Sequence, residues 1–241
     1  MTKSLIRNIE SYYTDMGSGQ AVVCLHGWGQ NTEMMQFIQD YLSARFRVIN
    51  LDFPGFGQSA EPDRGYSVDD YALWLHDLLE SLHVDNPILI GHSFGCRVAL
   101  VYANQYPVKK MVLTGAAGIR EPLSKEQVMK QKLYKMGKKL APALAAKYAK
   151  KVGSSDYQNA TGVMKETFVK VINQDLTSIL PYVNVETLLV FGDQDDATPL
   201  WMGKKMEQLM PNAGLAIFEG QGHYAYFVQA SRFLKVLDAF L

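Results

Sequence analysis

The chain has little cysteine, no excess of charge of either sign and no long apolar run. Its 241 residues include two cysteines, Cys24 and Cys96, which belong to no C-x-x-C or metal-spaced pattern and are expected to be buried free thiols. Basic and acidic residues are equal at 24 each, which gives no reason to expect a nucleic-acid partner. No stretch reaches the ~20 apolar residues of a membrane span, and residues 1–10 lack the apolar core of a signal peptide. We therefore expect no membrane span and a cytoplasmic location.

Short apolar runs alternate with amphipathic segments through the first half of the chain. After residues 6–14, which can carry one or two strands, the predicted elements are strand 21–25, helix 32–44, strand 47–53, helix 67–82, strand 87–91, helix 94–105 and strand 111–115. From residue 187 the predicted elements are strand 187–191, helix 200–209, strand 215–218 and helix 227–240. This alternation with short connections predicts an α/β fold, with a mostly parallel sheet and helices on both of its faces.

The alternation stops at Gly118 and resumes at Glu186. Between them the pattern predicts helices at 125–140, 142–151 and 162–172, a stretch too long for one βα loop. We therefore predict a helical cap over residues 119–185, inserted before the penultimate strand of a core made of residues 1–118 and 186–241. The cap holds twelve basic and five acidic residues. Two interpretations of this excess of basic residues stay open. The lysines form a solvated face of the helices, or they form a surface that attracts an anionic substrate or carrier.

The segment Gly91-His92-Ser93-Phe94-Gly95 lies between a predicted strand and a predicted helix. In that context G-x-S-x-G is typical of a nucleophile elbow, a sharp turn that holds the serine hydroxyl clear of the sheet edge. Gly91 and Gly95 fit because a Cβ at either position would collide with neighbouring backbone. Ser93 is therefore the candidate nucleophile.

A serine hydroxyl needs a base, and in this chain order the base follows the acid. His223, in the loop between the last strand and the last helix, is the candidate base. The other four histidines fit other roles: His92 is expected to point away from Ser93 across the elbow, His76 and His83 to lie on a surface helix, and His26 to make an orienting hydrogen bond beside the oxyanion loop.

The acid that orients the imidazole should follow the penultimate strand. The segment from Gly192 to Pro199 offers three aspartates. Asp195 is our choice because its spacing from Gly192 and Pro199 places it within the loop rather than at the end of the strand. Asp193 and Asp196 are interpreted as loop-capping carboxylates, with Asp196 as the alternative acid.

Two backbone N–H groups are needed to bind the oxyanion of a tetrahedral intermediate. Phe94 N–H, at the positive end of the helix after Ser93, is one candidate. Trp28 N–H, in the glycine-containing loop at 26–29, is the other. Neither a dinucleotide-binding glycine fingerprint nor a P-loop lysine is present, so no nucleotide cofactor is predicted.

Taken in order, these motifs resemble the α/β-hydrolase superfamily along almost the whole chain. They are the blocks at 25–29 (LHGWG) and 52–59 (DFPGFGQS), the elbow at Ser93, Asp195 before Thr198-Pro199, and Gly222-His223. The His-Gly-Trp-Gly loop is similar to that of carboxylesterases such as the pimeloyl-carrier-protein methyl ester esterase group, and the short cap to that of meta-cleavage-product hydrolases. Cys96 stands where many relatives have a second glycine. The serine nucleophile argues against relatives with an aspartate nucleophile.

The resemblance and the motifs together predict a cofactor-independent serine hydrolase without a metal, acting on a small carboxylic ester through an acyl-enzyme. The aromatic and methionine side chains near the predicted site favour an apolar acyl group; they are Trp28, Met34, Phe94 and Tyr224. Two alternatives remain: a C–C bond hydrolase or lyase using the same triad, and a ligand-sensing homologue with slow turnover.

Overall fold

A computed structural model describes residues 2–120, 129 and 155–241 of the chain, and within them an eight-stranded sheet. The strands are β1 (Thr2–Ile6), β2 (Ile9–Met16), β3 (Ala21–Leu25), β4 (Arg47–Leu51), β5 (Ile88–His92), β6 (Lys110–Thr114), β7 (Thr187–Gly192) and β8 (Ala213–Phe218). Their spatial order is β1-β2-β4-β3-β5-β6-β7-β8; β1 and β2 pair antiparallel with their neighbours, and the rest pair in parallel. The predicted mostly parallel sheet is confirmed.

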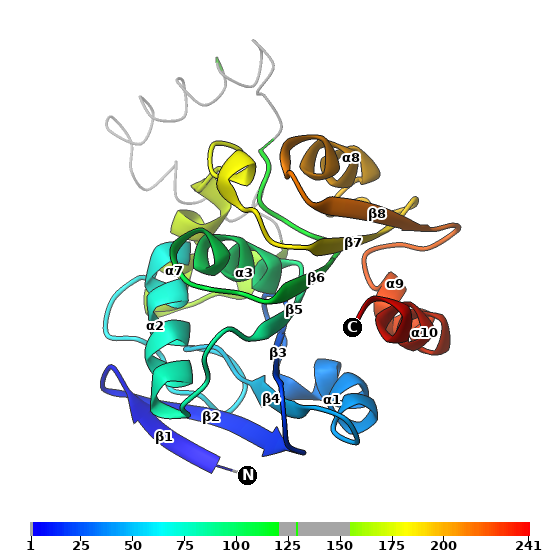
Figure 1. Ribbon diagram of the computed structural model, residues 1–241. Helices are drawn as coiled ribbons and strands as arrows, with labels where there is room; N and C mark the ends of the chain where they lie inside the picture. Colours follow the sequence, from blue (N-terminus) through cyan, green and yellow to red (C-terminus); the bar gives the residue numbers. More distant parts are fainter. Residues whose placement is uncertain (1, 121–128, 130–154) are drawn as a thin grey trace.

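Helices cover both faces of the sheet (Figure 1). The helical segments are η1 (Thr32–Met35), α1 (Gln36–Leu42), α2 (Val68–Ser81), α3 (Phe94–Gln105), α6 (Ser155–Asn159), α7 (Gly162–Asn173), η2 (Leu180–Tyr182), α8 (Leu200–Leu209), α9 (Ala225–Val228) and α10 (Ala230–Phe240). Side chains of α2, α3 and α8 join one core cluster, and those of α1 and α10 join a second cluster. The central strands β3 and β5 between them are wholly buried, as continuous apolar runs in a parallel sheet require.

Two predicted helices differ from the observed ones, and packing explains the second difference. The predicted helix 32–44 is a 3-10 turn followed by α1. The predicted helix 227–240 is divided at Gln229, whose φ of −108° and ψ of 46° are not helical. Tyr226 before the break and Phe233 after it are both fully buried, so the bend lets both segments reach the core.

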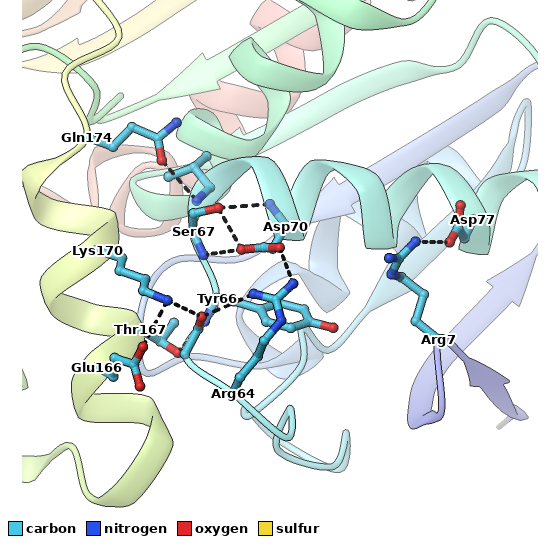
Figure 2. A network of polar contacts seen from close by, with 12 residues as sticks. Arg7, Arg64, Tyr66, Ser67, Asp70, Asp77, Glu166, Thr167, Lys170 and Gln174 are labelled. Carbon is cyan, nitrogen blue, oxygen red and sulfur yellow. Dashed lines mark hydrogen bonds and ion pairs between the residues drawn. The ribbon is translucent and has the colours of Figure 1, made fainter.

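The predicted helix 162–172 corresponds to α7, which is fastened to the segment that leads into α2 (Figure 2). Tyr66 N donates a hydrogen bond to Thr167 Oγ1 at 3.0 Å, and Val68 N donates one to Gln174 Oε1 at 3.1 Å. Lys170 Nζ donates to the Gly65 carbonyl at 2.7 Å. The predicted helices 125–140 and 142–151 lie outside the described residues apart from Met129, and the division into core and cap stays a prediction.

Candidate active site

Ser93 lies at the turn between β5 and α3. Its φ of 50° and ψ of −105° are angles that residues with a side chain rarely adopt. A Cβ at Gly95 would overlap the Leu25 carbonyl, and one at Gly91 would lie 3.0 Å from the Cys96 nitrogen. Both glycines are therefore needed for close approach of the backbone, as the sequence predicts. The turn leaves Ser93 half-buried at the carboxyl edge of the sheet.

The loops after β7 and β8 bring Asp195 and His223 together. His223 Nδ1 donates to Asp195 Oδ2 at 2.8 Å, and the Asp195 side chain is fully buried. The same carboxylate accepts hydrogen bonds from the amides of Ala197 and Thr198, each at 2.8 Å, and from the Thr198 hydroxyl at 2.7 Å. These donors fix the carboxylate, and through it the His223 ring.

The ionisation of Asp195 follows from these contacts. Burial by itself would raise the pKa of this carboxyl. Hydrogen bonds from His223 and Thr198 outweigh burial and hold its pKa below the ordinary range. Asp195 is therefore a carboxylate at neutral pH, able to accept a hydrogen bond from the Nδ1–H of His223 and so to leave Nε2 free as a base.

The other two aspartates of this loop lie elsewhere. Asp193 Oδ1 accepts a hydrogen bond from the Gly220 amide at 2.7 Å and so joins the loops after β7 and β8. Asp196 is exposed to solvent. Of the three, Asp195 is the one for which the structure gives a hydrogen bond with His223, and its role as the acid stays a prediction.

His223 and Ser93 lie at the same sheet edge, linked through β6. Ser93 N donates to the Thr114 carbonyl at 3.0 Å, and a Cβ on the next residue, Gly115, would come within 3.1 Å of His223 Nδ1. Ser93 and His223 make no hydrogen bond to each other in this structure, although both are described. Such bonds are often long in free enzymes and tighten when substrate binds.

His92 packs directly against the candidate base. Its ring centroid lies 4.7 Å from that of His223 and 4.6 Å from that of Tyr226. Nδ1 lies 3.2 Å from the Thr114 carbonyl, so it carries the proton and donates it there. Burial, with the nearby His223, lowers the pKa of His92 to about 3, and the ring is neutral. We expected His92 only to point away from Ser93; its contact with His223 was not foreseen.

His26 holds the predicted oxyanion loop. Its Nδ1 donates to the Gly27 carbonyl at 2.7 Å, and its Nε2 accepts from the Phe53 amide at 3.0 Å. Because it is fully buried, its pKa is lowered to about 4, and the two hydrogen bonds fix one neutral tautomer. Gln30 Oε1 accepts from the Gly27 amide at 2.9 Å. The orienting role predicted for His26 agrees with this geometry.

Trp28 and Phe94, the predicted oxyanion donors, come from different elements but lie together. Their ring centroids are 5.6 Å apart. The Trp28 ring also contacts Phe56 at 4.9 Å and, from α7, Phe168 at 5.0 Å. Phe94 is the first residue of α3, where an N–H has no partner within the helix. That these two amides bind an oxyanion stays a prediction.

Sequence reasoning missed Thr198 and Gly115 as parts of the site. Thr198 donates to Asp195, and its hydroxyl lies 3.2 Å from His223 Nδ1. The Asp-x-x-Thr spacing is a signal that could have found it, since an aspartate often bonds the backbone two residues on and so turns the chain back over its own carboxylate. Gly115 gave no such signal, because its role depends on where the β8 loop returns to the sheet.

Three described basic residues of the insert make local contacts. Lys165 lies over the Tyr157 ring at 4.3 Å, Lys170 pairs with Glu166 at 2.9 Å, and Arg120 donates to the Asn173 carbonyl at 3.2 Å. The other nine basic residues of the insert lie outside the described part of the chain, so attraction of an anionic partner stays a prediction.

One group in the described part of the chain has metal-ligating side chains in reach of one another. His76, Asp77 and Glu80 on α2 offer atoms within 4.8 Å. Asp77 already pairs with Arg7 at 2.7 Å, and His76 stacks on Tyr106 at 3.9 Å. The group lies away from Ser93 and contributes nothing to its site. Among the described helices, none is both long and apolar enough to span a membrane.

Comparison with protein families agrees with this architecture. A family model described as alpha/beta hydrolase fold matches residues 20–140, and one described as TAP-like protein matches residues 170–241. A 2-hydroxy-6-oxo-2,4-heptadienoate hydrolase of Pseudomonas putida is 27% identical over 98% of this chain and 94% of its own length.

Solved structures are similar over nearly the whole chain. An esterase from Exiguobacterium antarcticum has a TM-score of 0.78 and 26% identity, covering 99% of this chain and 98% of its own. A meta-cleavage product hydrolase from Pseudomonas fluorescens IP01 has a TM-score of 0.78 and 23% identity, covering 100% and 97%. These similarities include enzymes that cleave different bonds, so the reaction must be argued from the site.

Proposed function

This chain belongs to the α/β-hydrolase family, and on that premise we propose that it hydrolyses carboxylic esters through a covalent acyl-enzyme on Ser93. The observation that carries the proposal is the buried Asp195 carboxylate, which holds His223 by Nδ1 at the edge where Ser93 is strained outward. A neutral imidazole anchored in this way presents Nε2 as a base, which is what a serine hydroxyl needs to become a nucleophile.

The proposed reaction proceeds in two halves. Ser93 Oγ attacks the ester carbonyl carbon while His223 Nε2 takes its proton, and the amides of Trp28 and Phe94 bind the resulting oxyanion. His223 then gives that proton to the leaving alcohol as the C–O bond breaks. In the second half, water gives a proton to His223 and attacks the acyl-enzyme, and Ser93 regains its proton when the acid leaves. Asp195 stays ionised throughout and stabilises the imidazolium.

A second candidate is hydrolysis of a C–C bond by the same residues. The similarity to dienoate hydrolases at 27% identity favours it. A panel of p-nitrophenyl esters of increasing acyl length, measured beside 2-hydroxy-6-oxo-dienoic acids, separates the two reactions. We expect kcat/KM for the best ester to exceed that for every dienoic acid; the reverse order would replace the proposal by C–C hydrolysis.

Covalent labelling tests the nucleophile directly. A fluorophosphonate probe phosphonylates an activated serine, and we expect Ser93→Ala to remove the labelling seen in the wild type. Ser231→Ala, at an exposed serine of α10, serves as the matched control and should label fully. Labelling that persists in Ser93→Ala would rule out the elbow assignment.

A further inference from the structure

A cavity of about 460 Å³ lies beside the candidate active site. It is bounded on the core side by Trp28, the predicted oxyanion donor, and by Tyr224, the residue after His223. Its volume falls in the range of small-molecule pockets, which is roughly 300–1,000 Å³. Ser93 and His223 do not line the cavity themselves; Trp28 and Tyr224 join it to their site.

The chemistry of the wall differs from the apolar pocket that the sequence suggested. Of the four residues expected there, Trp28 and Tyr224 line the cavity, whereas Met34 and Phe94 do not. Its full lining is Trp28, Gly29, Gln30, Gly55, Phe56, Glu61, Asn159, Ala160, Thr161, Met164 and Tyr224. Six of these have polar side-chain atoms, one of them is a carboxylate, and none is lysine or arginine.

Glu61 supplies the carboxylate on a fixed backbone. The preceding residue, Ala60, donates its N–H to the Glu10 carbonyl at 2.8 Å and accepts from Gly55 N at 2.9 Å. Within the part of the chain described by the structure, Glu61 has no ion-pair partner. Lys165 of α7 lies over the Tyr157 ring and does not line the cavity. Counted over the described residues that line the cavity, the carboxylate therefore gives this wall a net negative charge.

Aromatic faces add to the same preference. Tyr224 is 44% exposed, so part of its ring is open to solvent, and Trp28 is half-buried. Cations bind over aromatic faces because the ring carries negative charge on its faces, and Trp and Tyr are good partners. A carboxylate, two aromatic rings and neutral amide and hydroxyl groups together suit a positively charged group and disfavour an anion.

We propose that this cavity selects esters that carry a positive charge, with Glu61 as the specificity-determining residue. The proposal rests on the ester hydrolysis proposed above. The cationic group is a quaternary or a protonated amine, on either the alcohol or the acyl side of the ester. Because Glu61 is exposed, water screens the attraction; an ion pair at 4 Å in water corresponds to about a fivefold preference.

Pairs of esters with the same shape, one cationic and one neutral, test whether the cavity selects a positive charge. Butyrylcholine and 3,3-dimethylbutyl butyrate differ by a nitrogen cation in place of a carbon on the alcohol side. The ethyl esters of 4-(trimethylammonio)butyrate and 5,5-dimethylhexanoate make the same exchange on the acyl side. We expect the wild-type ratio of kcat/KM, cationic over neutral, to exceed one for at least one pair, and to fall about fivefold in Glu61→Gln and with added salt.

Glu219→Gln is the matched control. Glu219 is exposed in the loop after β8, carries the same charge and does not line the cavity, so its removal should leave the ratio as in the wild type. An unchanged ratio in Glu61→Gln for both pairs, or an equal fall in Glu219→Gln, overturns the assignment of Glu61. If the wild type hydrolyses none of the four esters and no p-nitrophenyl ester, the proposed function fails instead.

Discussion

The carboxyl edge of the sheet and the attachment of α7 are both built from polar contacts, but of different kinds. At the sheet edge, His26, His92 and Asp195 are buried, and each has one protonation state: burial keeps the two histidines neutral, and hydrogen bonds keep Asp195 ionised. At the α7 attachment (Figure 2), the buried hydrogen bond from Tyr66 N to Thr167 Oγ1 joins neutral groups, whereas the ion pair between Lys170 and Glu166 is exposed.

This difference separates two uses of polarity. Buried titratable groups cost stability when their charge state changes, and such groups gather where chemistry requires a defined proton. Neutral hydrogen bonds to backbone fix position without sensitivity to pH, and exposed ion pairs contribute little. The sheet edge should therefore respond to mutation through activity and to acid through stability, whereas the α7 attachment should respond through stability alone.

The largest expected effect belongs to Asp195. Asp195→Asn keeps the shape of the side chain but loses the negative charge that accepts the hydrogen bond from His223 Nδ1–H, so the imidazole can adopt the wrong tautomer. By analogy with other triads, kcat should fall about ten-thousand-fold. Steady-state kinetics on the best p-nitrophenyl ester measure it, with KM nearly unchanged.

Asp196→Asn is the control for that change, since Asp196 is adjacent, exposed and of the same charge. Its kcat should stay within a few-fold of the wild type. A loss of kcat confined to Asp196→Asn would mean that the acid is misassigned.

The next effect is the pH dependence of stability. The pKa of His26 is lowered to about 4 and that of His92 to about 3, both mainly by burial, so each stays neutral in the folded protein. In the unfolded chain each takes up a proton near pH 6.5. Their contribution is therefore complete above about pH 6.5 and is lost as pH falls toward the folded values, at ~1.4 kcal/mol per pH unit for each histidine.

Urea unfolding at several pH values between 7 and 4 measures this slope. His92→Phe keeps a buried ring and removes one titrating group. The number of protons taken up on unfolding, which sets the slope of the unfolding free energy against pH, should therefore decrease by about one. An undiminished slope in His92→Phe would contradict a buried neutral His92.

The features of the sheet edge and of the α7 attachment that could be predicted from the sequence are those that depend on neighbouring residues in the chain. The elbow glycines flanking Ser93 follow from backbone crowding at one turn, and α7 follows from the spacing of its apolar residues. Asp195 was chosen over its neighbours from loop spacing, and the structure places it against His223. These patterns need only a few consecutive residues.

What sequence did not predict depends on contacts between distant segments. His92 meets His223 because the β8 loop returns over β5 and β6, and Glu61 borders the cavity because Ala60 pairs with Glu10. The division of 227–240 into two helices likewise reflects where Tyr226 and Phe233 find the core. No local pattern distinguishes these arrangements from a surface histidine, a loop glutamate or one continuous helix.

The smallest expected effect is a loss of stability at the α7 attachment, where two variants compare a neutral buried contact with a charged exposed one. Thr167 is fully buried, and its hydroxyl accepts from Tyr66 N and donates to the Val163 carbonyl. Thr167→Val keeps the shape and leaves the Tyr66 amide without a partner, which should lower the free energy of unfolding by about 1–3 kcal/mol at every pH. Glu166→Gln, one residue away, removes the charge of an exposed pair with Lys170 but keeps an oxygen that can accept from the Gly65 amide, so it should change stability little. Urea unfolding of the two variants decides the matter: equal losses would mean that exposed charges hold α7 as firmly as the buried hydroxyl does, and the contrast with the sheet edge would disappear.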